Sequence, residues 1–183
     1  MRHREPRLIE RMETPCMKPS TILSPFKVSE IEISYRNKVK ACDRPKVTSS
    51  QDTYALLFGM WEQNKLELVE QCNLLLLDRS HACLGLVRLS TGGMNGCIVD
   101  PKIAFATALK TRASSIILAH NHPSGNLQPS RADRDLTDKI YAGGRLLDIM
   151  LLDHLIVTRE GYLSFADEGL MPSGLGAVPL FSR

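Results

Sequence analysis

Residues 114–133 read SSIILAHNHPSGNLQPSRAD and say more about the fold than any other stretch of the chain. The first part of this stretch, 114–119, is small or apolar throughout, which is typical of a buried β-strand. The triplet HNH at 120–122 comes where this strand ends, and Ser130 is a favoured N-cap for a helix that follows. A buried strand that leads through a short loop into a helix indicates an α/β fold.

The same pattern of strands and helices extends to both sides of this stretch. The predicted strands cover residues 29–35, 68–77, 82–89, 97–99 and 162–165, with residues 146–157 forming one long strand or two. The predicted helices begin at Ser49 or Ser50, at Asp100 with Pro101, and at Ser130, and the last of them ends at Gly143-Gly144. A turn at residues 78–80 makes 68–89 a hairpin, so we expect a mixed sheet.

The composition is that of an ordinary globular protein, with 43% hydrophobic and 23% charged residues in a chain of 183. Its formal net charge of +3 comes from the N-terminal part, since residues 1–48 hold 11 Lys or Arg and 6 Asp or Glu. We therefore expect a basic, largely flexible arm over 1–47, one domain over 48–171 and a tail over 172–183. Neither a membrane span nor a secretory signal is recognisable, so a cytoplasmic location is expected.

The five cysteines are an odd number and include no C-x-x-C pair. Neither a disulfide framework nor a zinc–thiolate cluster is expected from such a set, and reduced thiols are the simple interpretation. Cys83 and Cys97 fall within or at the start of predicted strands, where we expect them to act as small apolar core residues.

Two histidines and one aspartate suggest a metal site at the end of the buried strand. His120 and His122 are two residues apart, so their side chains project to the same side of an extended chain, and the loop is short enough to bring Asp133 opposite them. Two imidazoles and one carboxylate are a common catalytic zinc set, and they also suit non-haem iron, although no oxygenase-like context accompanies them. Taken singly, solvated histidines and a Ser130–Asp133 capping box are simpler explanations, but their combination in this order favours the metal site.

The spacing of H-x-H, seven residues, Ser, two residues and Asp is the JAMM motif of the JAB1/MPN metalloproteases. The sequence resembles the RadC-like bacterial branch of that group in SSIILAHNHPSGNLQPSRAD, in LLDHLIV and in YLSFADEG, over about residues 48–170. This resemblance implies a cytidine-deaminase-like α/β fold, with a mixed, curved sheet flanked by helices.

The resemblance also implies a reaction and the residues for it. His120, His122 and Asp133 would bind one zinc ion, and Ser130 would hydrogen-bond the bound water or the developing oxyanion. The implied reaction is hydrolysis of a peptide or isopeptide bond, in which the metal-bound water attacks the carbonyl. A peptide or isopeptide is therefore the expected substrate.

The glutamate that serves the family as general base is not found at its expected place. Val87 or Arg88 stands there, a few residues before the Gly-rich turn, and an arginine cannot act as a base at neutral pH. Glu70, on the preceding predicted strand, is the least unsuitable substitute. The chain could therefore hydrolyse slowly, or it could be a catalytically silent binding module that keeps the fold.

Further residues could support the site from behind the ligands. His154 and Asp153, within LLDHLIV, could orient a zinc ligand, although a histidine satisfied within the core is the commoner case. Asn121, between the two histidines, is expected to bond the backbone of the loop.

Nucleic acid is a further candidate partner, because RadC-like proteins carry a DNA-repair name. Residues 1–48 are too short and too rich in proline for the helix-hairpin-helix module of longer members. The basic side chains of the arm could touch phosphates, but a solvated tail explains them equally well and is the preferred interpretation. The sequence does not indicate an oligomeric state.

Overall fold

The computed structural model describes residues 31–93 and 97–172, and the structural statements below concern these residues. The chain divides into two units, Met1–Ile33 and Ser34–Arg183, and the elements named here belong to the second. The helices are α1 (Ser50–Met60), α2 (Pro101–Thr111) and α3 (Arg131–Leu146), with a short 3-10 helix at Ala41–Asp43. The strands are β1 (Gln71–Leu77), β2 (Cys83–Thr91), β3 (Ser115–Asn121), β4 (Met150–Val157) and β5 (Tyr162–Ser164).

The three α-helices begin where the sequence predicts, because each has a side chain that caps its first turn. The Ser49 hydroxyl accepts a hydrogen bond from the Asp52 backbone N–H at 3.0 Å, and the Asp100 carboxylate accepts one from the Lys102 N–H at 2.9 Å. Ser130 caps α3 in the same way. These contacts satisfy backbone donors that a helix leaves without an internal partner.

The five strands form one mixed sheet in the order β2-β1-β3-β4-β5. β1 pairs antiparallel with both β2 and β3, and the predicted turn of the β1–β2 hairpin is held by the Asp78 carboxylate, which accepts hydrogen bonds from Ser80 and Ala82. β3 and β4 are parallel, because α3 carries the chain back between them. The predicted α/β fold with a mixed sheet flanked by helices is confirmed.

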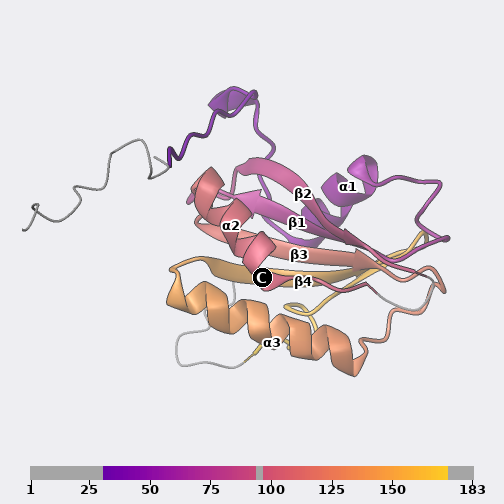
Figure 1. Ribbon diagram of the computed structural model, residues 1–183. Coiled ribbons are helices and arrows are strands. Elements are labelled where there is room, and N and C mark those ends of the chain that lie inside the picture. Colours follow the sequence, from indigo (N-terminus) through magenta and orange to yellow (C-terminus); the bar gives the residue numbers. More distant parts are fainter. Residues whose placement is uncertain (1–30, 94–96, 173–183) are drawn as a thin grey trace, which may run out of the picture. The chain divides into compact units, whose positions relative to one another are not determined.

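Both faces of the sheet are covered, α2 and α3 lying on one face and α1 on the other (Figure 1). The core on the α2–α3 face includes Leu74, Leu76, Phe105, Ile116, Leu118 and Ile140. The core on the α1 face includes Leu57, Trp61, Leu75, Ile117 and Leu155. Alternate residues of β1 and β3 therefore pack into opposite cores, which explains why the sequences of these strands are continuously apolar.

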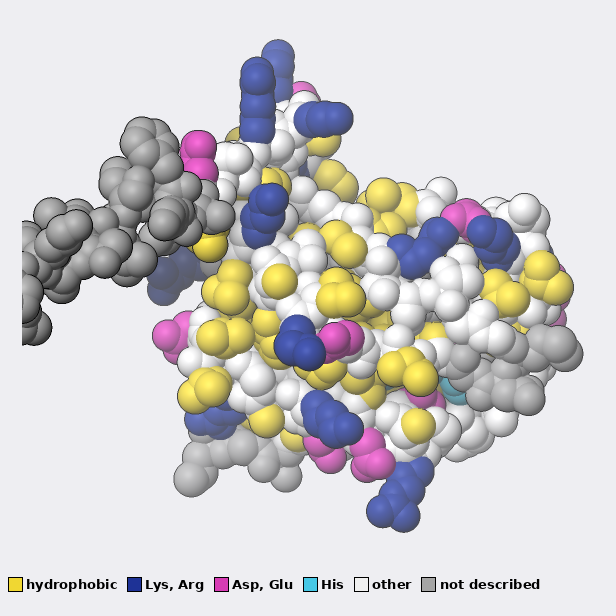
Figure 2. Space-filling model, in the orientation of Figure 1, with side chains coloured by type: hydrophobic (Ala, Val, Ile, Leu, Met, Phe, Trp, Pro, Cys, Tyr) yellow, Lys and Arg dark blue, Asp and Glu magenta, His cyan; other side chains and the backbone are white. Residues whose placement is uncertain are grey.

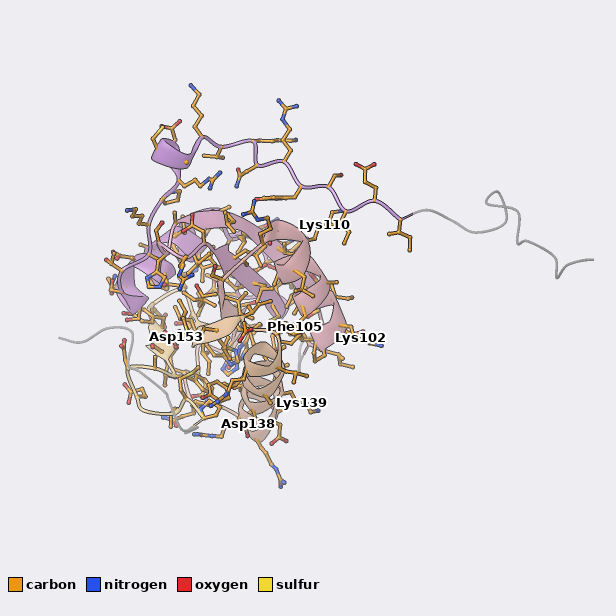
Figure 3. All side chains as sticks on the ribbon, turned by 90° about the vertical axis from the view of Figure 1, so that its left-hand side faces the viewer. Lys102, Phe105, Lys110, Asp138, Lys139 and Asp153 are labelled. Carbon is orange, nitrogen blue, oxygen red and sulfur yellow. The ribbon has the colours of Figure 1, made fainter. Side chains whose placement is uncertain are left out.

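Figure 3 shows Phe105 of α2 directed toward α3, while Lys102, Lys110, Asp138 and Lys139 lie on the outer sides of these helices. The space-filling view in the orientation of Figure 1 shows hydrophobic side chains among the charged ones (Figure 2). Two apolar residues of α2, Ile103 and Leu109, are 51% and 54% exposed. None of the helices in the described part of the chain is long and apolar enough to cross a membrane.

Two predicted strands are wrong within the described residues. The strand predicted over 29–35 is absent from residues 31–35, where Ile31 and Ile33 are 85% and 80% exposed; residues 29 and 30 lie outside the described ones. Residues 97–99 alternate in burial as a strand would, with Ile98 exposed and Val99 in the core, but they pair with no strand and lead directly into α2. Alternating burial alone therefore does not make a strand.

The predicted arm is joined to the sheet over part of its length. The Tyr35 hydroxyl and the Asn37 side-chain amide both donate to the Leu84 carbonyl of β2, at 3.3 and 3.0 Å. Further along, Lys46 forms a β-bridge with Ala82.

The glycine pair at 143–144 does not end α3, contrary to the prediction, because the helix continues to Leu146. Neither glycine has a positive φ, so neither acts as a left-handed cap. Both lie instead where α3 meets its neighbours closely, Gly143 against the ring of Phe105 and Gly144 against the backbone carbonyl of Ile149. The chain then turns at Asp148, whose φ is 54°, and β4 follows as a single strand.

Candidate metal centre

His120 lies near the end of β3, on the side of the sheet that α3 covers. The strand end is fixed by its neighbour Asn121, whose side-chain oxygen accepts from the Gln71 N–H at 2.7 Å and whose amide donates to the carbonyls of Leu66 and Val69 at 2.6 and 2.9 Å. Asn121 therefore bonds backbone, as predicted, but the backbone that precedes and begins β1. This anchoring sets the position of the histidines on either side of it.

His122 lies just beyond the strand and is held at both its backbone and its ring. Its backbone N–H donates to the Val157 carbonyl at 3.0 Å, and its Nδ1 lies 2.5 Å from the Asn126 carbonyl oxygen. Gly125 allows the turn between these residues, since its φ is 77°. The loop thus directs the Nε2 atom of His122 back toward His120, 2.9 Å from the Nε2 atom of that ring.

Asp133 completes the group from the first turn of α3. The Ser130 backbone N–H and hydroxyl both donate to its Oδ2 at 2.7 Å, and its own N–H donates back to the Ser130 hydroxyl at 3.1 Å. The capping box considered from the sequence is therefore present. In this arrangement the Ser130 hydroxyl orients the carboxylate of Asp133.

The three side chains meet at one point, as the sequence predicted. His120 Nε2 lies 3.2 Å from Asp133 Oδ1 and His122 Nε2 lies 3.8 Å from Asp133 Oδ2. Among the described residues, their ligand atoms form a group within 4.8 Å that could hold a metal ion. Two ligands placed at about 2.0–2.1 Å from a tetrahedral zinc ion lie roughly 3.3 Å apart, so the residues present fit such an ion closely.

The electrostatics of Asp133 suit a metal ligand. Burial is the largest single influence and would raise the pKa of this carboxyl, but the hydrogen bond and charge interaction with His120 and the bonds from Ser130 together outweigh it. The net pKa lies well below the usual range of an aspartate, so the carboxylate remains ionised at neutral pH.

His154 lies directly behind His120, and its Nε2 atom is 2.8 Å from His120 Nδ1. Its ring stacks on Phe165 with 4.7 Å between the ring centroids, and its Nδ1 atom is 2.7 Å from the Thr137 hydroxyl. Complete burial holds the pKa of His154 well below its ordinary value, which keeps the ring neutral.

Asp153, the other predicted supporting residue, does not contact the three ligands. Its carboxylate accepts hydrogen bonds from the Ser164 hydroxyl at 2.6 Å and from the backbone N–H groups of Ala166 and His154 at 3.0 and 2.7 Å. Figure 3 shows it set apart from α3. Neighbouring residues of a strand face opposite sides, so Asp153 projects away from the side on which His154 meets His120. Its hydrogen bonds tie β4 to β5 and the residues just after it.

Asp153 should make the stability of the protein depend on pH. Burial raises its pKa from about 3.8 to about 6, against the opposing effect of its three hydrogen bonds. Below about pH 4 both folded and unfolded chains hold this proton, whereas between about pH 4 and 6 only the folded chain does, so stability falls as pH rises through this window. A shift of this size corresponds to about 3 kcal/mol, which remains a constant penalty above pH 6.

We expect the substitution Asp153→Asn to remove this dependence. The free energy of unfolding of the variant, relative to wild type, should rise by about 3 kcal/mol between about pH 4 and pH 7 in urea denaturation. The exposed Asp138 offers the same replacement outside the buried network as a control. A difference between Asp153→Asn and wild type that stays constant with pH would contradict the expectation.

The position expected for a general base holds no carboxylate. Val87 packs against the core on the α2–α3 side, and Arg88 is exposed and pairs with Glu62. Glu70 is half-buried just before β1, where its backbone bonds Gly92 and Gly93. Its carboxylate is not in the group of ligand atoms formed by the two histidines and Asp133.

Two features of this region were not predicted. Cys72 lies opposite His120 in the β1–β3 register, and its thiol hydrogen-bonds that of Cys97, which lowers the pKa of Cys97. Cys97 packs against the core as expected, but outside any strand.

Thr137, which contacts His154, is the second feature. It lies one helical turn after Asp133 on the same face of the helix, and this spacing could have identified it as a neighbour of the site.

Comparisons with known proteins agree on one family. The model of the RadC-like JAB domain matches residues 47–170 of this chain. A UPF0758 protein of Flavobacterium johnsoniae is 38% identical over 144 residues, which are 78% of this chain and 62% of that protein. A UPF0758 protein of Methanosarcina barkeri is 40% identical over 127 residues, 69% of this chain and 54% of that protein. This chain therefore covers less than two thirds of the length of either relative.

Proposed function

Because the chain belongs to the RadC-like JAB domain family, we propose that it is a zinc-dependent hydrolase of the JAMM type that cleaves a peptide or isopeptide bond. The single observation that carries this proposal is the meeting of His120, His122 and Asp133 at one point. His120 is 2% exposed and Asp133 9% exposed. Each is held by a side chain that is not itself a proposed ligand, His120 by His154 and Asp133 by Ser130. Such support is typical of metal ligands.

The residues have distinct parts in this proposal. His120 Nε2, His122 Nε2 and one Asp133 oxygen would hold the ion, which when bound lowers the pKa of a water molecule and polarises a substrate carbonyl. Ser130 keeps the Asp133 carboxylate oriented by donating its hydroxyl proton to Oδ2, and to stabilise a developing oxyanion it would have to turn this single proton away from Asp133. A donor of that kind contributes about 2.7–4 kcal/mol to catalysis.

The base is the weak element of the mechanism. Glu70 remains the candidate, since it precedes by two residues Cys72, which lies opposite His120 in the β1–β3 register. A positioned base contributes roughly 10²–10⁴-fold to the rate, so hydrolysis without one would be slow by this factor.

The presence of Val87 and Arg88 where a general base is expected favours a second candidate function, a metal-binding domain without hydrolytic activity. Its guanidinium pairs with Glu62, so neither this position nor the apolar Val87 supplies a base. Such a domain would bind a partner through the same fold and leave its peptide bonds intact.

Metal analysis tests the shared premise of both candidates. We expect the purified wild-type protein to contain about one zinc ion per chain and the double variant His120→Ala, His122→Ala to contain almost none. His81→Asn is the matched control, because His81 lies in the β1–β2 turn, at the opposite end of β1 from Cys72 and His120. Equal and substoichiometric zinc in wild type and double variant would reject the metal site.

Hydrolysis of peptide and isopeptide substrates then separates the two candidates. Turnover that disappears in Asp133→Ala supports the enzyme and defeats the silent domain. If Glu70→Gln lowers the hydrolysis rate roughly 10²-fold or more relative to wild type, with the zinc content unchanged, Glu70 is identified as the base. Zinc binding without turnover on either class of substrate would favour the silent domain.

A further inference from the structure

Three buried hydrogen bonds connect one proposed ligand to another. The Thr137 hydroxyl donates to the Asp133 backbone carbonyl at 2.7 Å and lies 2.7 Å from His154 Nδ1. His154 Nε2 is in turn 2.8 Å from His120 Nδ1. Thr137, His154 and His120 are all almost completely buried, so water does not compete for these contacts.

The direction of these bonds follows from the number of protons available. The Thr137 hydroxyl has one proton, and the Asp133 carbonyl can only accept it. His154 Nδ1 must therefore carry a proton and donate it to the oxygen of Thr137. A neutral imidazole has only one N–H, so His154 Nε2 is an acceptor, and the proton in its contact with His120 belongs to His120 Nδ1.

The consequence appears on the other side of the His120 ring. With one proton held on Nδ1, His120 directs Nε2 to the centre of the site, where a metal ion can replace the proton that Nε2 shares with Asp133. His122 does the same, since its Nδ1 donates to the Asn126 carbonyl. The Nε2 atoms of the two rings lie 2.9 Å apart with the Asp133 carboxylate beside them, so a cation that replaces the protons at this point would be bound by both rings and by the carboxylate.

We propose that Thr137 is a positioning residue which, through His154, fixes the proton of His120 on Nδ1 and keeps Nε2 free for the metal. The inference rests on the proposed function, since it concerns the same site. We call the three hydrogen bonds from Asp133 through Thr137 and His154 to His120 the relay. If the relay ran in the opposite direction, His154 would donate from Nε2, and the His120 proton would lie on the nitrogen that must bind the ion. Partners that fix the tautomer of a ligating histidine typically change metal affinity 10–100-fold.

The substitution Thr137→Val tests the relay, because it removes the hydroxyl and keeps the shape of the side chain. We expect the dissociation constant for Zn²⁺, measured in competition with a chromophoric chelator, to rise 10–100-fold, and Thr137→Ser to restore it. Thr53→Val is the matched control: Thr53 is also buried and its hydroxyl donates to the carbonyl one turn earlier, Ser49, at 3.0 Å, but that helix lies on the other face of the sheet. An unchanged zinc affinity in Thr137→Val, or no recovery in Thr137→Ser, would overturn the proposal.

A second measurement needs neither metal nor substitution. Correlation of imidazole ¹⁵N with ring protons in the metal-free protein shows which ring nitrogens are protonated, and we expect a proton on Nδ1 of both His120 and His154 and none on Nε2 of His154. A proton on Nε2 of His154 would overturn the relay even if zinc binds. If the wild-type protein binds no zinc, the proposed function fails, whereas the tautomers still decide whether the relay exists.

Discussion

Adding Zn²⁺ is expected to raise the melting temperature of the wild-type protein by about 5–10 °C. A ligand that binds only the folded chain at about 100 times its dissociation constant stabilises it by about 2.7 kcal/mol. For a domain of this size each kcal/mol shifts the melting temperature by roughly 2–4 °C. The ligands of this site come from β3, the loop after it and α3, so the unfolded chain does not hold them together.

The substitution His122→Ala should abolish this shift, because it removes one of the three ligands without disturbing a core residue. His81→Asn should retain the full shift, and an excess of chelator should reverse it in wild type. Differential scanning fluorimetry at a series of zinc concentrations measures all of these. Equal stabilisation of His122→Ala and wild type would place the bound zinc elsewhere on the protein.

The site was readable from the sequence because its members lie close together along the chain. His120, His122 and Asp133 are brought together by one strand end, one loop and one helix start, and each of these has a local pattern. Ser130 was visible for the same reason, because a capping box is a contact between residues three apart.

The contacts behind the proposed ligands join residues that are distant in sequence. His154 reaches His120 across the β3–β4 pairing, and the sequence could not decide between it and Asp153, since the two adjoin each other in one apolar strand. Their alternation across the sheet separates them, and only the pairing of β4 with its neighbours shows which of them faces α3.

The ends of elements were predicted less well where packing, and not local preference, decides them. A glycine pair is a familiar helix end, but here Gly143 and Gly144 lie inside α3 because larger residues would collide with its neighbours. Val99 is buried as it would be in a strand, yet it packs into the core from a segment that pairs with no strand among the described residues. In both cases the deciding contact is with a residue that no local pattern identifies.

The second large effect is expected at Gly144. A Cβ atom added there would lie 2.3 Å from the backbone oxygen of Ile149, whose own N–H donates to the Gly144 carbonyl at 2.8 Å. The next residue, Met150, begins β4, and its N–H donates to the carbonyl of Ser114, the residue just before β3, so the end of α3 cannot move away without disturbing the parallel pair of strands. Overpacking of this kind costs about 1–3 kcal/mol and occasionally more.

We therefore expect Gly144→Ala to lower the free energy of unfolding by about 2–3 kcal/mol, even though alanine favours helix over glycine. Gly59 in α1 is the matched control, because an added Cβ meets nothing within 4 Å there, and Gly59→Ala should stabilise the protein by about 0.5–1 kcal/mol. Gly143→Ala should fall between wild type and Gly144→Ala, since its Cβ would meet the ring of Phe105, a side chain that can shift, at 2.6 Å. Urea denaturation of the three variants gives this order directly, and a Gly144→Ala protein as stable as Gly59→Ala would show that the α3–β4 junction is not packed as described.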